Sequence, residues 1–115
     1  YGPLVSGHGV NWTRGTPKYF RSSNLVRRGF CEACGTPLSY EDGSSVELAI
    51  GAFDDPTVAA PVIQVNPHDR LPFVDAIPHL PVRTPADAPA SEEFKARVVS
   101  RQHPDHDTEA WPPAA

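Results

Sequence analysis

The chain has 115 residues, a length that suits one domain with a single hydrophobic core. Hydrophobic residues make up 39% and charged residues 21%, while proline is enriched at 14 residues. The net charge of −4 argues against general nucleic-acid binding, and no apolar stretch is long enough for a membrane span. No signal peptide opens the chain. From the net charge and the lack of a long apolar stretch, we predict neither a nucleic-acid partner nor a membrane partner.

Seven short strands are predicted in the first two thirds of the chain, where brief apolar runs alternate with Gly, Pro, Asn and Asp. In chain order they are Leu4–Ser6, Val10–Trp12, Pro17–Ser22, Leu25–Phe30, Pro37–Tyr40, Ser45–Gly51 and Val62–Val65. Alternation in the sixth run directs Val46, Leu48 and Ile50 toward the core. Turns are expected at residues 14–17, 41–44 and 54–56.

The composition changes after Pro81, where prolines and alanines indicate a linker. Ser91 is the expected N-cap of a helix that runs to about Arg101, with Phe94 and Val98 on one face. The tail beyond is expected to be irregular, with Trp111 as an apolar anchor. We therefore predict a β domain over residues 1–82, followed by a linker, a short helix and a tail over residues 83–115. No helix separates the predicted strands, so the fold class is mainly β rather than parallel α/β.

The pair Cys31 and Cys34, followed by Gly35, is the sharpest local signal. It fits a zinc half-site, a redox pair or two incidental thiols. A redox pair of the thioredoxin type needs a helix after the second cysteine, whereas Pro37 here leads into a predicted strand. A zinc knuckle at the tip of a hairpin is therefore favoured. With no disulfide scaffold in the sequence, a reducing, cytoplasmic setting is expected.

Two cysteines supply half of a structural zinc site, which takes four ligands. The other ligand-type side chains that we considered are the five histidines, His8, His68, His79, His103 and His106. None has convincing spacing to the cysteine pair. We therefore expect the missing ligands to lie outside the 115 residues or to be absent.

Several ordered motifs resemble a known family. They are Trp12–Gly15, Tyr19–Ser23, Arg28–Leu38, Gly51–Pro56 and Leu71–Pro78. Together they are similar to the glutathione-dependent formaldehyde-activating enzymes, the GFA or centromere-protein-V family, over about residues 10–82. The resemblance implies a β-tent, the Mss4-like zinc fold, which would here be incomplete at its N-terminus and carry one short C-terminal helix.

The resemblance also implies a function, a zinc-dependent carbon–sulfur lyase acting on the adduct of glutathione and formaldehyde, S-hydroxymethylglutathione. Typical members carry further cysteines upstream, including a three-cysteine cluster for the zinc assigned to catalysis. Only the structural half-site, Cys31 and Cys34, has a counterpart here, and the chain starts at Tyr1 rather than Met. We expect a processed or partial product that depends for stability on a missing segment or another chain. The alternative is a non-catalytic zinc-binding or structural module that has lost the cluster.

Arg14, Arg21 and Arg28 are candidates for holding the carboxylates of a glutathione-like substrate, because guanidinium and carboxylate pair through two parallel hydrogen bonds. The alternative is that they are surface positions on strands. The expected partner is a small thiol such as glutathione, and a homo-oligomer remains open. No other catalytic motif is present, so no catalytic residue is assigned.

Overall fold

The computed structural model describes residues 2–112 of the chain. It divides into two compact units. The first holds the described residues up to Val62 together with those from Gln102 onward, and the second is Ile63–Arg101. The domain boundary expected after residue 82 falls inside the second unit.

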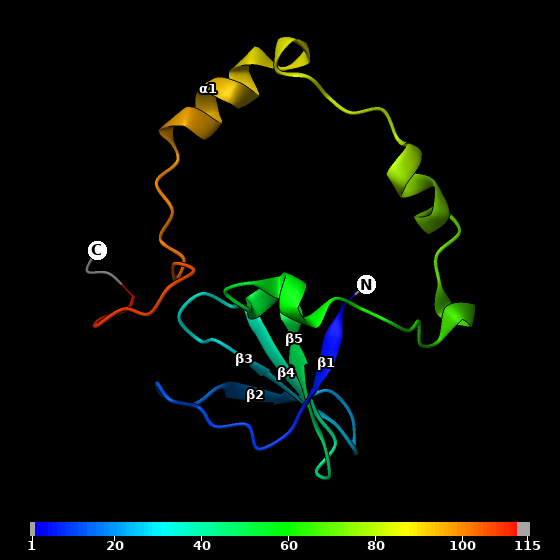
Figure 1. Cartoon of the computed structure of the whole chain (residues 1–115), viewed down its shortest axis with the longest axis vertical. Helices are drawn as coiled ribbons and strands as arrows, with labels where there is room; N and C mark the ends of the chain where they lie inside the picture. The colour runs from blue at the N-terminus through cyan, green and yellow to red at the C-terminus, as the bar shows by residue number, and fades with distance from the viewer. Residues whose placement is uncertain (1, 113–115) are drawn as a thin grey trace. The chain divides into compact units, whose positions relative to one another are not determined.

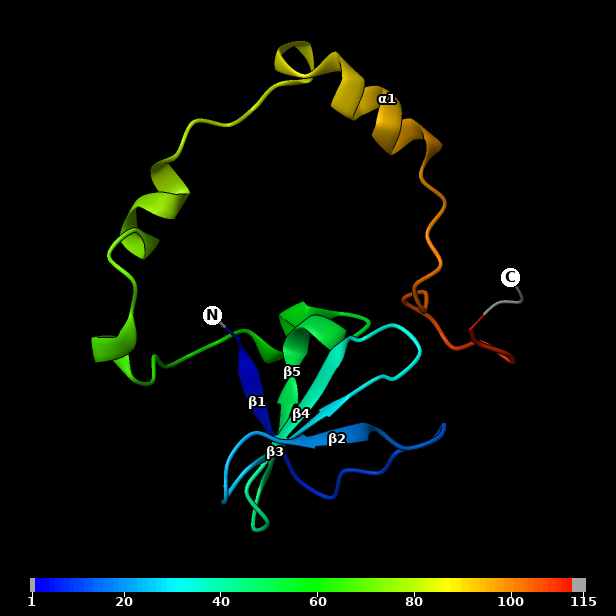
Figure 2. The same cartoon turned by 180° about the vertical axis from the view of Figure 1, so that it is seen from behind.

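The first unit is built on a five-stranded antiparallel sheet (Figure 1), which confirms the mainly β prediction. Its strands are β1 (Leu4–Gly7), β2 (Lys18–Arg21), β3 (Arg27–Phe30), β4 (Pro37–Glu41) and β5 (Val46–Ala49). The order across the sheet is β1-β5-β4-β3-β2. β2 to β5 are joined by consecutive hairpins, and β1 pairs with β5, so β1 and β2 are the two edges (Figure 2).

Two predicted strands do not form. Val10–Trp12 belongs to the loop that takes the chain from the β1 edge to the opposite edge at β2, so it has no neighbouring strand to pair with. Val62–Val65 is also irregular, and its Val62 and Val65 side chains are 96% and 80% exposed. Short apolar runs form strands only where a partner supplies the other half of the hydrogen-bond ladder.

The strand register assigns side chains to the two faces of the sheet. Arg27 on β3 lies opposite Arg21 on β2 and opposite Glu41 on β4. The next residue, Arg28, lies opposite Phe20 and Tyr40. Because successive side chains of a strand point to opposite faces, the Arg21 level and the Arg28 level belong to different faces. A register shift between Gly29 and Phe30 ends this regular pairing just before the cysteine turn.

The apolar core is small. Among residues 2–112, the buried apolar side chains are Ile50, which is 6% exposed, and the ring of Pro17. Ile50 opens the 3-10 helix Ile50–Ala52 after β5, and its backbone N–H donates to the Pro3 carbonyl oxygen at 3.2 Å. Of the core set predicted for this segment, Val46 and Leu48 are half-buried. Ser39 and Glu41, both polar and both 6% exposed, are buried beside them in the same sheet.

The second unit consists of short helices joined by extended chain. It contains the 3-10 helices Pro67–Asp69, Val74–His79 and Pro85–Asp87, and the α-helix α1 (Pro89–Arg97). The prediction of a helix was right, but its bounds were wrong. Pro89 takes the first helical position, where its missing N–H costs nothing, so Ser91 is not the N-cap. The helix ends at Arg97 because the β-branched Val98 and Val99 that follow favour extended backbone.

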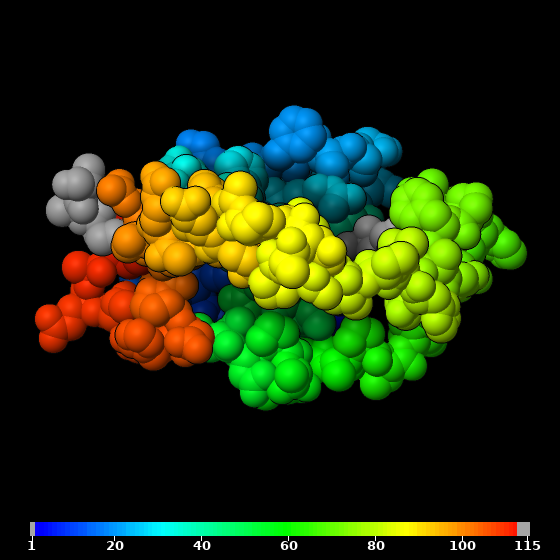
Figure 3. Space-filling view, turned by 90° about the horizontal axis from the view of Figure 1, so that it is seen from above, coloured from blue at the N-terminus to red at the C-terminus, as the bar shows by residue number. Residues whose placement is uncertain are grey.

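No side chain of residues 63–101 is buried, and the atoms of α1 are open at the surface in Figure 3. Phe94 on α1 is 67% exposed and Val98 lies beyond the helix end, so the expected apolar face does not pack within this unit. None of the helices in residues 2–112 has the length and apolar character needed to cross a bilayer.

Candidate functional site

The cysteine pair lies in a closed loop between β3 and β4, as the sequence predicts. The backbone N–H of Cys31 donates to the Thr36 carbonyl oxygen at 2.9 Å, and that of Gly35 donates to the Cys31 carbonyl oxygen at 2.7 Å. Gly35 has a φ of +79°, a left-handed conformation that is unfavourable for any residue with a Cβ. The glycine after the second cysteine therefore allows the loop to close with both cysteines on one turn.

The two thiols differ in their surroundings. Cys31 is half-buried and Cys34 is exposed, and neither is in a disulfide. The Cys34 Sγ lies 3.1 Å from the Thr36 Oγ1. Hydrogen bonds from the Thr36 hydroxyl and backbone lower the pKa of the Cys34 thiol, with a smaller contribution from Cys31 and against the opposing effect of burial. A lower pKa increases the share of thiolate, the form that binds a metal ion or attacks a disulfide.

The structure separates the zinc and redox interpretations in one respect. In a redox pair of the thioredoxin type, a helix that begins at the cysteines stabilises the thiolate. Here the next element after Cys34 is strand β4, and it is Thr36 that stabilises the thiolate. The geometry is that of a hairpin tip, without the helix that a redox pair of the thioredoxin type needs.

The structure places no further ligand-type side chains beside Cys31 and Cys34 in the part of the chain that it describes. Among residues 2–112, no group of three or more His, Cys, Asp or Glu side chains is placed to hold a metal ion. His103 Nδ1 lies 2.7 Å from the Pro104 carbonyl oxygen, and His106 lies 3.5 Å from Asp105. Two thiols on one turn suit two positions of a tetrahedral zinc and leave two positions to be supplied.

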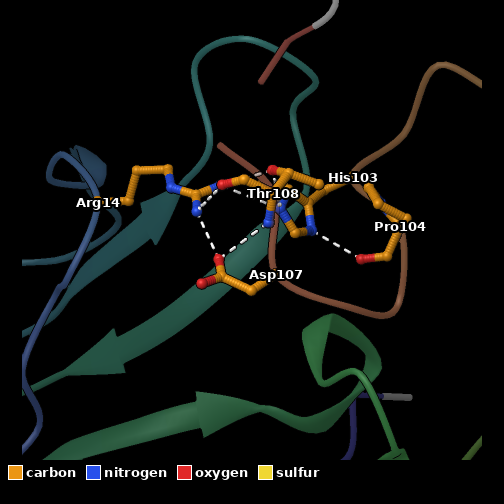
Figure 4. A network of polar contacts seen from close by, with 5 residues as sticks. All are labelled: Arg14, His103, Pro104, Asp107 and Thr108. Carbon is orange, nitrogen blue, oxygen red and sulfur yellow. Dashed lines mark hydrogen bonds and ion pairs between the residues drawn. The ribbon is translucent and has the colours of Figure 1, made fainter. Parts of the chain in front are cut away.

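The guanidinium of Arg14 contacts the C-terminal segment of the first unit (Figure 4). It contacts the Asp107 carboxylate at 2.5 Å, the Thr108 hydroxyl at 2.8 Å and the Thr108 carbonyl oxygen. It also lies 3.2 Å from His103 Nε2. His103 Nε2 also lies 3.1 Å from the Thr108 hydroxyl, so Arg14, His103 and Thr108 meet at one point. Arg14, a candidate for binding a substrate carboxylate, is therefore already paired with the Asp107 carboxylate of the same chain.

The other two candidate arginines lie on different faces of the sheet. Arg28 stacks over the Tyr40 ring, with its Cζ 5.1 Å from the ring centroid. Arg21 donates from Nη1 to the Asn24 carbonyl oxygen at 3.3 Å. The structure does not bring Arg14, Arg21 and Arg28 together into one substrate-binding group.

A polar network that the sequence analysis missed links three strands on the Arg21 face. Arg27 binds one oxygen of the Glu41 carboxylate through Nε at 2.8 Å and Nη2 at 2.7 Å. The Ser39 hydroxyl donates to the other carboxylate oxygen at 2.9 Å, and Arg27 stacks 3.9 Å from the Tyr19 ring centroid. Burial and the neighbouring Glu41 raise the pKa of Tyr19, and Arg27 partly opposes this. Only the register could have revealed the network, because these residues show no motif.

Comparisons of the chain with protein-family models, with curated proteins and with solved structures find no match. The resemblance to the formaldehyde-activating enzymes therefore stays a prediction that rests on the motifs alone.

Proposed function

We propose that this chain is a zinc-binding β domain of the formaldehyde-activating type, in which Cys31 and Cys34 hold a structural zinc. The observation that supports the proposal is the closed turn between β3 and β4, with two free thiols and a left-handed Gly35. The five-stranded antiparallel sheet is compatible with the β-tent of this family. Two further ligands, cysteine thiolates by the family pattern, would come from another segment or a second copy.

The proposed activity is that of a carbon–sulfur lyase on S-hydroxymethylglutathione in the cytoplasm. A zinc ion held by three thiolates, with one open position, would polarise an oxygen or bind the substrate thiolate. This chain has two cysteines, and both belong to the knuckle. That observation favours the second candidate function, a zinc-binding module without the reaction. In either case, the knuckle's role would be to join the β3–β4 hairpin to whatever supplies the other ligands.

Zinc content tests the structural proposal directly. Elemental analysis of protein purified without added metal is expected to find about one zinc per chain, or about half if two copies share an ion. Cys31→Ser and Cys34→Ser are each expected to abolish zinc binding. His8→Ala and His106→Ala are matched controls, since they remove a ligand-type side chain elsewhere and should leave zinc unchanged. Zinc-free protein with two reactive thiols would contradict the proposal.

The lyase proposal has its own test. Zinc-loaded protein is mixed with glutathione and formaldehyde, and adduct formation and cleavage are followed by NMR. Acceleration that disappears in Cys31→Ser would support the lyase. Zinc-loaded protein that leaves the rate at the uncatalysed level would assign the chain to the non-catalytic module instead.

A further inference from the structure

An open cleft of about 550 Å³ lies where the β2–β3 and β4–β5 turns meet. One wall is formed by Arg21, Asn24, Leu25 and Arg27, and the other by residues 41–46. The volume lies within the range of small-molecule sites, about 300–1,000 Å³. Both walls belong to the first unit, on the face of the sheet that carries the Arg27–Glu41 network.

Two guanidinium groups enter this cleft at the same level of neighbouring strands. Arg21 and Arg27 are direct cross-strand partners, an arrangement of like charges that destabilises a sheet unless an anion compensates. Arg27 is compensated, because Glu41 accepts two hydrogen bonds from it and the Tyr19 ring supports its plane. Its side chain remains 49% exposed toward solvent.

The charge of Arg21 is not compensated in the same way. Its Nη1 donates to the Asn24 carbonyl oxygen, which does not neutralise a cation, and among residues 2–112 no carboxylate forms an ion pair with Arg21. A guanidinium presents five N–H donors in a planar fork that matches a carboxylate. Arg21 therefore lacks a carboxylate partner of the kind that Arg27 has in Glu41.

The opposite wall carries a fixed negative charge. Asp42 Oδ1 accepts hydrogen bonds from the backbone N–H groups of Ser44 and Ser45, at 2.9 and 2.8 Å, and from both serine hydroxyls. These bonds hold the carboxylate in place at the rim. A site with Arg21 on one side and Asp42 on the other disfavours a compact dianion such as phosphate and favours a ligand with charges of both signs.

We propose that this cleft binds the zwitterionic α-amino-acid end of a small molecule or peptide, with its carboxylate on Arg21 and its ammonium toward Asp42. The proposal follows from the cleft itself, and only the choice of glutathione as the probe rests on the proposed function. It assigns to Arg21 a role that Arg28, on the other face, does not share.

The test is a titration of the full chain, followed by NMR or calorimetry, with glutathione as the zwitterionic probe and glutarate and inorganic phosphate as anions without an ammonium group. Saturable glutathione binding is expected, with Arg21→Gln weakening it by about tenfold or more. Arg28→Gln is the matched control, since it makes the same charge change on the opposite face and should leave affinity unchanged. Asp42→Asn should weaken glutathione binding and not glutarate binding, while its side-chain oxygen can still accept from the turn.

Several outcomes would overturn the proposal: no saturable glutathione binding, equal losses in Arg21→Gln and Arg28→Gln, or phosphate binding tighter than glutathione. Arg21→Lys is a second variant that controls for misfolding, because it keeps the positive charge and removes only the planar guanidinium. It should give an intermediate loss of glutathione affinity. Zinc content measured on the same samples separates the two proposals. Glutathione binding by zinc-free protein would support the cleft proposal and contradict the zinc proposal. Zinc-containing protein that does not bind glutathione would support the zinc proposal and contradict the cleft proposal.

Discussion

Gly29 shows how one missing side chain allows a polar network to form. It is buried on β3, and a Cβ at this position would overlap the Ser39 hydroxyl and lie 3.2 Å from both Pro17 Cβ and Tyr19 Cε1. The Ser39 hydroxyl is the donor that holds the second oxygen of Glu41. The absence of a side chain on β3 is therefore what lets β4 present Ser39 and Glu41 to Arg27.

Gly29→Ala is expected to lower the free energy of unfolding by about 1–3 kcal/mol, because Ser39 or the strand must shift to relieve the overlap. Denaturant unfolding of the variant and the parent chain measures this. Gly51→Ala is the control, since nothing lies within 4 Å of its added Cβ and its φ is not in the left-handed region. Equal effects of the two substitutions would contradict the close approach of Ser39.

Asp42 makes stability depend on pH in a defined window. Hydrogen bonds from the Ser44 and Ser45 backbones, and then from their hydroxyls, lower its pKa from 3.8 to about 2. Because the folded pKa lies below the unfolded one, the stabilisation is present above about pH 4 and is lost as pH falls toward 2. NMR titration of the Asp42 carboxyl should give a midpoint near the lower value. A midpoint near 4, or acid stability unchanged in Asp42→Ala, would contradict the turn geometry.

At the scale of elements, the β3–β4 hairpin is the part that local sequence predicts best. Its strands are contiguous with the turn, and Cys31, Cys34 and Gly35 mark the turn by their spacing. Val10–Trp12 has the same apolar character as a strand but lies where the chain crosses between the two sheet edges. A short run such as Val10-Asn11-Trp12 does not by itself indicate whether a partner strand will lie beside it.

The C-terminal segment of the first unit is an element held by side chains rather than by a ladder. Its irregular course was predicted, and Trp111 is half-buried, with its ring centroid 5.8 Å from that of His103 in an edge-on contact. The indole N–H of Trp111 is buried without a hydrogen-bond partner in the part of the chain that the structure describes. The anchoring of this segment therefore comes from the ring and from the Arg14 contacts.

Arg14→Gln is expected to release residues 103–108, because the ion pair with Asp107 and the bonds to Thr108 are lost together. Hydrogen exchange of the Thr108 amide, which donates to the Asp107 carboxylate, should quicken several-fold. Trp111→Phe should keep the segment docked, since the indole N–H has no partner to lose, whereas Trp111→Ala should release it. Arg28→Gln is the charge-matched control. Unchanged exchange in Arg14→Gln would exclude Arg14 as the anchor.

At the scale of the whole molecule, the chain buries little apolar surface. Among residues 2–112, only Ile50 and Pro17 are buried apolar side chains, and Phe20 and Leu25 are 65% and 71% exposed. A five-stranded sheet with so small a core gains little from the hydrophobic effect. That further ligands or another chain contribute to stability stays a prediction.

We therefore expect unfolding of the zinc-free chain to be weakly cooperative, with a shallow dependence on denaturant. Added zinc should raise the midpoint, because a ligand that binds the folded state stabilises it, and a chelator should reverse the effect. Cys31→Ser should remove the zinc effect. A steep transition that is insensitive to chelator in the monomer would refute this expectation.

Sequence by itself determined the features that depend on neighbouring residues: the mainly β class, four consecutive hairpin strands, and the turn with Cys31 and Cys34. Their physical basis is local, since side-chain alternation and turn chemistry act over a few positions. Only the tertiary structure decided which distant groups meet. Arg27 pairs with Glu41, 14 residues away, because the register places the two residues opposite each other on β3 and β4. Arg14 pairs with Asp107, 93 residues away, because the C-terminal segment belongs to the same unit as the sheet. A pairing of that kind depends on how strands align, and a single residue of slip would move every side chain to the other face.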